Sequence, residues 1–188
     1  MAFAQYSKAV ARLQTNDESS AQTASWTKQL ALITFSNIEK RKDNPKGQYN
    51  KNVAATRSFK SLAVPMIDIN LCLEMCEALS PEEIAADLPN IDARIEQDLL
   101  QVMQFYDKEY GLLRENISDS KEDMDTFEGR LVNPGHSIEC LWFILDLLNK
   151  RTDTLFSSSG ASTAAQKQIE IKEWALKTLK KTLEYGWD

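Results

Sequence analysis

The sequence of 188 residues has few of the residues that build metal, disulfide and phosphate sites. It contains one histidine, three cysteines and six glycines. A zinc site needs several cysteine or histidine ligands, so we expect no metal. The odd number of cysteines indicates reduced thiols in a cytoplasmic protein, and we expect Cys72, Cys76 and Cys140 to be small apolar core residues. No glycines have the spacing of a phosphate-binding loop, so the sequence places no nucleotide site.

Long apolar runs and basic clusters are also missing. No apolar run reaches the roughly 20 residues of a membrane span, and residues 1–10 do not have the pattern of a signal peptide. The net charge is −6, and the basic run Lys40–Lys42 is followed at once by Asp43. These features argue against membrane and nucleic-acid partners.

The spacing of apolar residues predicts a chain that is almost entirely helical. We expect helices over residues 2–13, 21–40, 61–79, 80–106, 136–149 and 164–184, separated by loops at 16–20, 43–52 and 157–162. In the second of these helices, Trp26, Leu30 and Ile33 lie on one apolar side. Ser80 is the predicted N-cap of the fourth helix, Pro81 its first residue and Glu83 the partner in a capping box, and Pro89 can break this helix.

A different pattern separates the fourth and fifth helices. Residues 111–117 are predicted to form a strand and residues 129–132 a second extended piece, which together suggest a short β-hairpin. The six helices fall into three consecutive pairs with a period of about 60 residues, which indicates helical hairpins stacked as in an α/α toroid.

The segment from Asn133 to Glu139 reads N-P-G-H-S-I-E and is followed by Trp142. Asn133 can cap a helix and Pro134 suits its first turn, which places His136 in that turn. Glu139 lies three residues further on and shares a helix face with His136. Its carboxylate could hold one ring nitrogen and leave the other for a substrate.

This segment resembles the catalytic-histidine signature of the N-acylglucosamine 2-epimerase family. Leu62–Met66 with Asn70, Leu113–Ile117 and Tyr185–Asp188 resemble further family segments, so the similarity runs from about Ser25 to Asp188. The resemblance implies an all-α fold, an incomplete (α/α)6 barrel, in which residues 1–188 form a single partial domain truncated at both ends.

The resemblance also implies a sugar 2-epimerase of the N-acylglucosamine/N-acylmannosamine type, acting on an amino sugar or another aldose. His136 would be one acid/base and Glu139 its supporting residue, while Arg130, Asn70 and Trp142 would contact the substrate. The family uses two histidines and this sequence has one, so we expect the chain alone to be inactive. No cofactor is required; ATP as an effector and a homodimer of the full-length protein are further expectations from the family.

Simpler roles stay open for the same residues. Glu139 could be an ordinary first-turn acid, Arg130 could pair with Glu128 or another surface acid, Trp142 could be core packing, and Asn70 could bind backbone. The alternative functions are an aldose–ketose isomerase or cellobiose 2-epimerase on the same barrel, or a non-catalytic helical scaffold that binds another protein.

Overall fold

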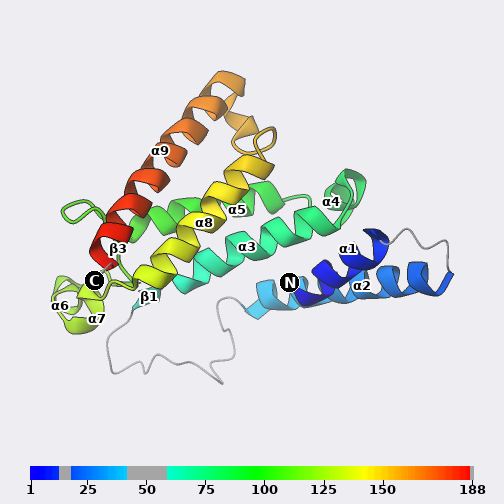
Figure 1. Cartoon of the computed structure of the whole chain (residues 1–188), viewed down its shortest axis with the longest axis horizontal. Coiled ribbons are helices and arrows are strands. Elements are labelled where there is room, and N and C mark those ends of the chain that lie inside the picture. The colour runs from blue at the N-terminus through cyan, green and yellow to red at the C-terminus, as the bar shows by residue number, and fades with distance from the viewer. Residues whose placement is uncertain (13–17, 42–58, 187–188) are drawn as a thin grey trace. The chain divides into compact units, whose positions relative to one another are not determined.

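A computed structural model describes residues 1–12, 18–41 and 59–186 and confirms the all-α class (Figure 1). Its α-helices are α1 (Ala2–Arg12), α2 (Glu18–Arg41), α3 (Ala63–Ala78), α4 (Pro81–Asp87), α5 (Ile91–Gln104), α6 (Lys121–Met124), α7 (Phe127–Arg130), α8 (Pro134–Lys150) and α9 (Ala161–Gly186), with a 3-10 turn η1 (Ser157–Ser159). None of the helices in this part of the chain is long and apolar enough to cross a membrane. The predicted 43–52 loop and the last two residues, Trp187 and Asp188, lie outside the described residues.

The chain divides into two compact units. Unit 1 comprises residues 1–51 and 71–91, and unit 2 comprises residues 52–70 and 92–188. The boundary falls inside α3, so this helix contributes residues to both units.

Unit 1 contains a helical hairpin of α1 and α2, which pack against each other. The Ser7 hydroxyl of α1 donates a hydrogen bond to the carbonyl of Ala24 in α2 at 2.9 Å. Sequence periodicity suggested Trp26 and Ile33 as the apolar side of α2, but both side chains are exposed, and the buried positions are Thr27, Ala31 and Phe35. The buried face of α2 is thus centred on the small residue Ala31, which the pattern of large apolar residues did not reveal.

The start of α4 confirms the predicted capping box. The Ser80 hydroxyl accepts from the Glu83 backbone N–H at 3.3 Å, and the Glu83 carboxylate accepts from the Ser80 N–H at 2.8 Å. The expected break is also present, because α4 ends at Asp87 and α5 begins at Ile91, on either side of Pro89.

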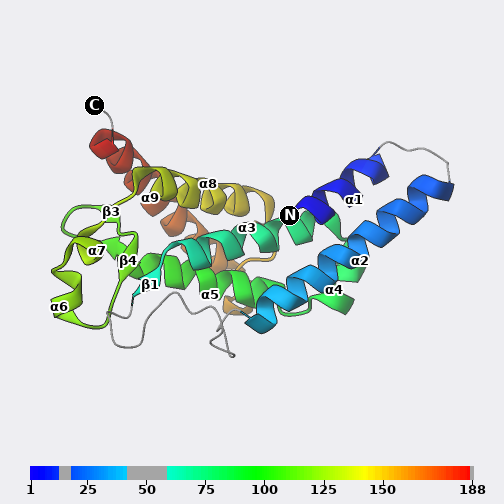
Figure 2. The same ribbon diagram turned by 90° about the horizontal axis from the view of Figure 1, so that it is seen from below.

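In unit 2, α8 and α9 pack as an antiparallel hairpin (Figures 1 and 2). The last turn of α9 lies on the first turn of α8, since a Cβ added to Gly186 would be 2.8 Å from the Pro134 Cβ. Leu141, Ile144 and Leu147 of α8 are fully buried. This packing holds the first turn of α8 in place, and His136 lies in that turn.

The β structure consists of two small antiparallel pairs. Strand β1 (Lys60–Ser61) pairs with β4 (Asn116–Ile117), and β2 (Tyr106–Asp107) pairs with β3 (Leu112–Leu113). A short hairpin, β2–β3, lies after the fourth predicted helix, but it is not the predicted pair. Residues 111–117 contribute to both sheets instead of forming one strand, and residues 129–132 contain no strand.

The predicted extended piece at 129–132 is wrong for its first half. Residues Phe127–Arg130 form α7, because the Thr126 hydroxyl caps a helical turn by accepting from the Gly129 N–H at 3.3 Å. The backbone becomes extended only at Leu131, whose carbonyl accepts from the Glu115 N–H at 2.8 Å.

Gly129 sits where α6 and α7 meet, and we predict that Gly129→Ala destabilises the protein. A Cβ there would lie 2.5 Å from both the Asp123 carbonyl oxygen and the Met124 Cα, which are backbone atoms that cannot rotate away. We expect a loss of about 1–3 kcal/mol in the free energy of unfolding, measured by urea denaturation. The control is Gly135→Ala, where the nearest atom would be the Asn133 side-chain oxygen at 3.4 Å. Equal stability of the two variants would contradict this packing.

Candidate active site

His136 is held in the first turn of α8. The Asn133 side-chain oxygen accepts a hydrogen bond from the His136 backbone N–H at 3.3 Å, and Pro134 follows the cap. Proline suits this position because the first N–H groups of a helix have no partner within the helix. The sequence prediction of a capped helix with His136 in its first turn is therefore confirmed.

The imidazole of His136 contacts the carboxylate of Glu115. Nδ1 lies 3.0 Å from Oε1 and 2.9 Å from Oε2 of Glu115. The Glu115 side chain is 13% exposed, whereas that of His136 is 42% exposed. One ring nitrogen is thus bound to a nearly buried carboxylate, while Nε2 makes no hydrogen bond to any described residue. A hydrogen bond at Nδ1 selects the tautomer in which Nε2 carries the free lone pair.

Glu115 lies between β3 and β4, and its backbone is bonded on both sides. Its N–H donates to the Leu131 carbonyl at 2.8 Å, and its carbonyl accepts from the Leu62 N–H at 2.9 Å. These bonds join three segments that are distant in the sequence. They fix the backbone from which the Glu115 carboxylate reaches the histidine.

The neighbouring residue, Arg114, ties the same segment to two further elements. Its Nε donates to Asp107 Oδ2 at 2.8 Å, its second guanidinium nitrogen also binds Asp107, and the third donates to the Gly129 carbonyl at 2.7 Å. Burial raises the pKa of the Asp107 carboxyl. Hydrogen bonds from the Tyr110 N–H, Arg114 and the Glu109 N–H outweigh that effect, and the pKa lies below its ordinary value.

Two residues beneath the histidine are buried on α8. The Ser137 hydroxyl is 3.5 Å from the Leu113 carbonyl, to which it donates. Burial, together with the nearby charge of Glu139, raises the pKa of the Cys140 thiol to about 12. Cys140 therefore stays protonated at neutral pH and packs as a core residue, as expected for this cysteine, rather than acting as a nucleophile.

From the helical spacing we expected Glu139 to hold the His136 ring. The carboxylate that contacts the ring is instead that of Glu115. Glu139 is exposed one turn further along α8. Side chains on a helix lean toward its N-terminus, so the His136 ring points back toward the β3–β4 segment. Glu115 was missed because its approach depends on long-range backbone pairing. The only signal for it was its place in Leu113–Ile117, which resembles a family segment.

The expected substrate contacts lie in different surroundings. Trp142 is 62% exposed, so it is not core packing, and with Gly135 and Glu139 it forms one exposed face of α8. Arg130 is exposed and donates to the carbonyl of Asp125 at 2.9 Å and to its carboxylate at 2.6 Å, rather than to His136. Asn70 is buried on α3.

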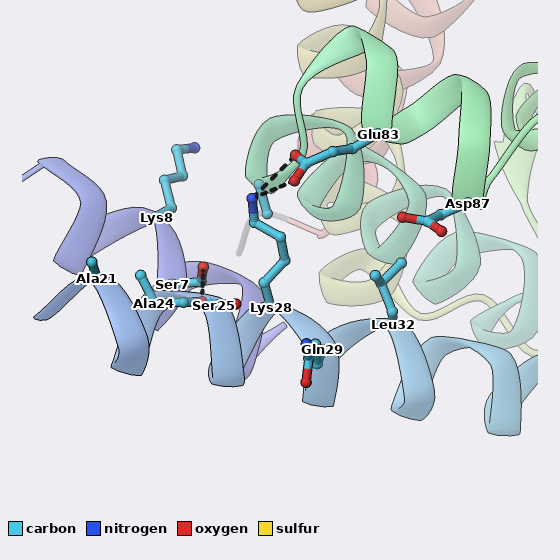
Figure 3. Close-up of a pocket in the computed structure, with 11 residues that line it drawn as sticks. Ser7, Lys8, Ala21, Ala24, Ser25, Lys28, Gln29, Leu32, Glu83 and Asp87 are labelled. Carbon is cyan, nitrogen blue, oxygen red and sulfur yellow. Dashed lines mark hydrogen bonds and ion pairs between the residues drawn. The ribbon is translucent and has the colours of Figure 1, made fainter. Parts of the chain in front are cut away.

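A cavity of about 390 Å³ lies within unit 1, lined by α1, α2, the last residue of α3 and α4 (Figure 3). Lys28 reaches across it to the Glu83 carboxylate, with distances of 2.8 and 3.1 Å to the two oxygens. This contact, with the Ser80 N–H, lowers the pKa of Glu83. The lining has two basic and two acidic residues, so it carries no excess of either charge. They are Lys8, Lys28, Glu83 and Asp87. Elsewhere too, no group of histidine, cysteine and acidic side chains in the described ranges could hold a metal ion.

Fold and site together define an all-α protein with a carboxylate-bound histidine in the first turn of α8, one helix of the α8–α9 hairpin. The family described as N-acylglucosamine 2-epimerase (GlcNAc 2-epimerase) matches residues 2–188. The chain belongs to this family.

Curated relatives carry the same description. N-acylglucosamine 2-epimerase of Bos taurus is 30% identical over 112 residues, which cover 60% of this chain and 25% of that protein. The Rattus norvegicus protein of the same name is 26% identical over 112 residues, covering 60% of this chain and 26% of the relative. The Homo sapiens protein is 32% identical over 84 residues, or 45% of this chain and 18% of the relative. The matched segment thus spans about a quarter or less of the length of these relatives.

We predict that Asp107→Asn lowers the stability of the fold at neutral pH and reduces the further loss of stability as the pH falls. The folded chain binds the Asp107 proton less tightly than the unfolded chain, whose ordinary pKa is 3.8. This stabilisation is complete well above pH 3.8 and is lost as the pH falls through the lower folded pKa. Removing the charge leaves Arg114 without its carboxylate, which costs about 1–3 kcal/mol at pH 7.

The test is to measure melting temperatures from pH 7 to pH 3. The control variant is Asp119→Asn, because the Asp119 side chain is 96% exposed and lies 3.7 Å from Lys60. The control should follow the wild-type curve. A wild-type acid response in the Asp107 variant would show that this carboxylate does not stabilise the turn.

Proposed function

We propose that this chain supplies one acid/base residue, His136, of a sugar 2-epimerase of the N-acylglucosamine/N-acylmannosamine type. The observation that carries the proposal is the contact of 2.9–3.0 Å between His136 Nδ1 and the Glu115 carboxylate at the start of α8. Membership of the family and the names of the relatives support the substrate class.

The chemistry begins with the open-chain sugar, whose C2 hydrogen is acidified by the adjacent aldehyde. Nε2 of His136 removes this proton, and the electrons of the broken C–H bond form the C1–C2 double bond of an enediolate. A second acid then returns a proton to the opposite face of C2, and the aldehyde re-forms. A positioned general base of this kind accelerates proton transfer by about 10²–10⁴-fold.

Glu115 supports this step in two ways. Its carboxylate fixes the tautomer that leaves Nε2 unprotonated, and its charge stabilises the imidazolium that forms when Nε2 takes the proton. Because Glu115 is nearly buried and its backbone is bonded to Leu62 and Leu131, its position is set before substrate arrives.

Inversion needs a second proton donor on the opposite face, and the sequence contains one histidine. We propose that the 188-residue chain does not epimerise sugars by itself. Trp142 and Glu139 lie on the exposed face of α8, where Trp142 could stack on a sugar ring. Arg130 and Asn70 are proposed as further substrate contacts, which for Arg130 requires release from Asp125.

The experiment places His136→Asn and Glu115→Gln in a protein that has this segment within the full length of its relatives. We expect His136→Asn to lower kcat by at least 10²-fold with an unchanged circular dichroism spectrum, and Glu115→Gln to lower kcat more than it changes KM. The matched control is Asp119→Asn, which makes the same carboxylate-to-amide change at a side chain that is 96% exposed. Wild-type activity in His136→Asn would exclude the base assignment.

The isolated chain gives a separate test. N-acetylmannosamine, mannose and cellobiose are incubated with it, and the epimers are separated by chromatography. We expect no epimer from any of them. Formation of an epimer would contradict the need for a partner outside this chain, and the sugar that reacted would identify the substrate class.

A further inference from the structure

Arg114 binds two segments of unit 2 at once, one through a carboxylate and one through a backbone carbonyl. Two nitrogens of its guanidinium bind the Asp107 carboxylate, and the third donates to the Gly129 carbonyl at 2.7 Å. The Arg114 backbone N–H donates to the Phe105 carbonyl at 2.9 Å. Its side chain is 21% exposed, so water only partly screens these contacts. The residue is therefore anchored at the β2–β3 pair while its side chain reaches α7.

The two segments lead to the two groups of the candidate site. Glu115 directly follows Arg114, and its N–H donates to the Leu131 carbonyl at 2.8 Å. Leu131 comes two residues after Gly129, in the stretch that enters α8 and His136. The guanidinium thus adds a second link between the segment that carries the carboxylate and the segment that leads to the imidazole.

This second link matters because the stretch before α8 has little apolar packing. None of residues 121–124 is buried, and Gly129 is the one buried residue of 127–130. A segment with few buried side chains depends on its hydrogen bonds for its position. The Asn116 side-chain amide donates to the Glu128 carbonyl at 3.3 Å, which is longer than the 2.7 Å bond from Arg114. A bond from a charged donor is also roughly twice as strong as one between neutral groups.

We propose that Arg114 is a positioning residue for the acid/base pair. By holding the Gly129 carbonyl, it keeps the Glu115 carboxylate at Nδ1 of His136. A shift of about 1 Å between the two segments would lengthen the contact of 2.9–3.0 Å beyond hydrogen-bond reach, and such a shift can lower a rate by about 10²-fold. The effect on catalysis rests on the proposed function, whereas the effect on the ring does not.

Arginine suits this role because one planar group serves both partners. A lysine at position 114 would keep an ion pair with Asp107, but a single ammonium replaces a rigid fork of five N–H donors. It would therefore keep the charge pairing and lose the simultaneous bond to the Gly129 carbonyl. Arg114→Lys thus separates the positioning of the site from the stability that the ion pair supplies.

The first measurement is nitrogen-15 NMR of the one histidine in the 188-residue chain. We expect Arg114→Lys to move part of the proton of the neutral imidazole from Nδ1 to Nε2, and Arg114→Met to move more of it. The matched control is Arg151→Lys. Arg151 is 16% exposed and binds Asp92, but it lies at the C-terminal end of α8, away from His136. The control should lose a similar amount of stability to urea and leave the ring unchanged.

The second measurement is kinetic and uses a protein that has this segment within the full length of its relatives. We expect Arg114→Lys to lower kcat about tenfold and to change KM by less than about twofold, because Arg114 acts on the base and not on the substrate. Arg151→Lys should keep both constants near their wild-type values. A rise in KM at unchanged kcat would contradict the proposal, since it would make Arg114 a substrate contact.

Two NMR results would overturn the proposal. One is an unchanged ring in both Arg114 variants, which would leave Arg114 with a role in stability alone. The other is an equal shift in Arg151→Lys. The base assignment fails on a different result, wild-type activity in His136→Asn, so the positioning of the ring and its use in catalysis are tested separately.

Discussion

The candidate site depends on how the backbone of Glu115 is held. Hydrogen bonds to Leu62 on one side and Leu131 on the other place this residue between β1 and the segment that enters α8. The adjacent Arg114 adds contacts to Asp107 and to the Gly129 carbonyl. Each contact joins parts of the chain that are far apart in sequence, so the carboxylate reaches His136 only when the surrounding fold is complete. A histidine oriented in this way has one nitrogen defined by the protein and the other left for chemistry.

The same arrangement extends from the histidine support to the β2–β3 turn. Asp107 binds Arg114 on one side and shapes the β2–β3 turn on the other through the Glu109 and Tyr110 N–H groups. Arg114 in turn directly precedes Glu115, whose carboxylate contacts His136. One partly buried ion pair thus stabilises both the segment that supports the histidine and the β2–β3 turn.

Local features of the sequence predicted much of the fold. The long helices followed from apolar spacing, the starts of α4 and α8 from the caps Ser80 and Asn133, and the break between α4 and α5 from Pro89. These signals are local, because a helix and its caps are made by residues within a few positions of one another. The His136 position could be predicted for the same reason.

What the sequence did not reveal depends on contacts between distant segments. Glu139 was favoured because it is near His136 in the helix, while Glu115 reaches the ring from 21 positions away in the sequence. The extended interpretation of 129–132 missed the Thr126 cap. The choice of Trp26 and Ile33 as the packed side of α2 missed the burial of its smaller residue Ala31. Pairing partners and approach distances are set by tertiary packing, which overrides short-range pattern.

The most direct test of the account is the protonation of the two ring nitrogens of His136 in the neutral imidazole. Because the chain has one histidine, nitrogen-15 NMR of the labelled protein reports this ring alone. The account predicts a proton on Nδ1 and a free Nε2, with Glu115→Ala moving the proton toward Nε2 and Glu139→Ala leaving it in place. A proton on Nε2 in the wild-type chain, or an equal effect of the two variants, would contradict it.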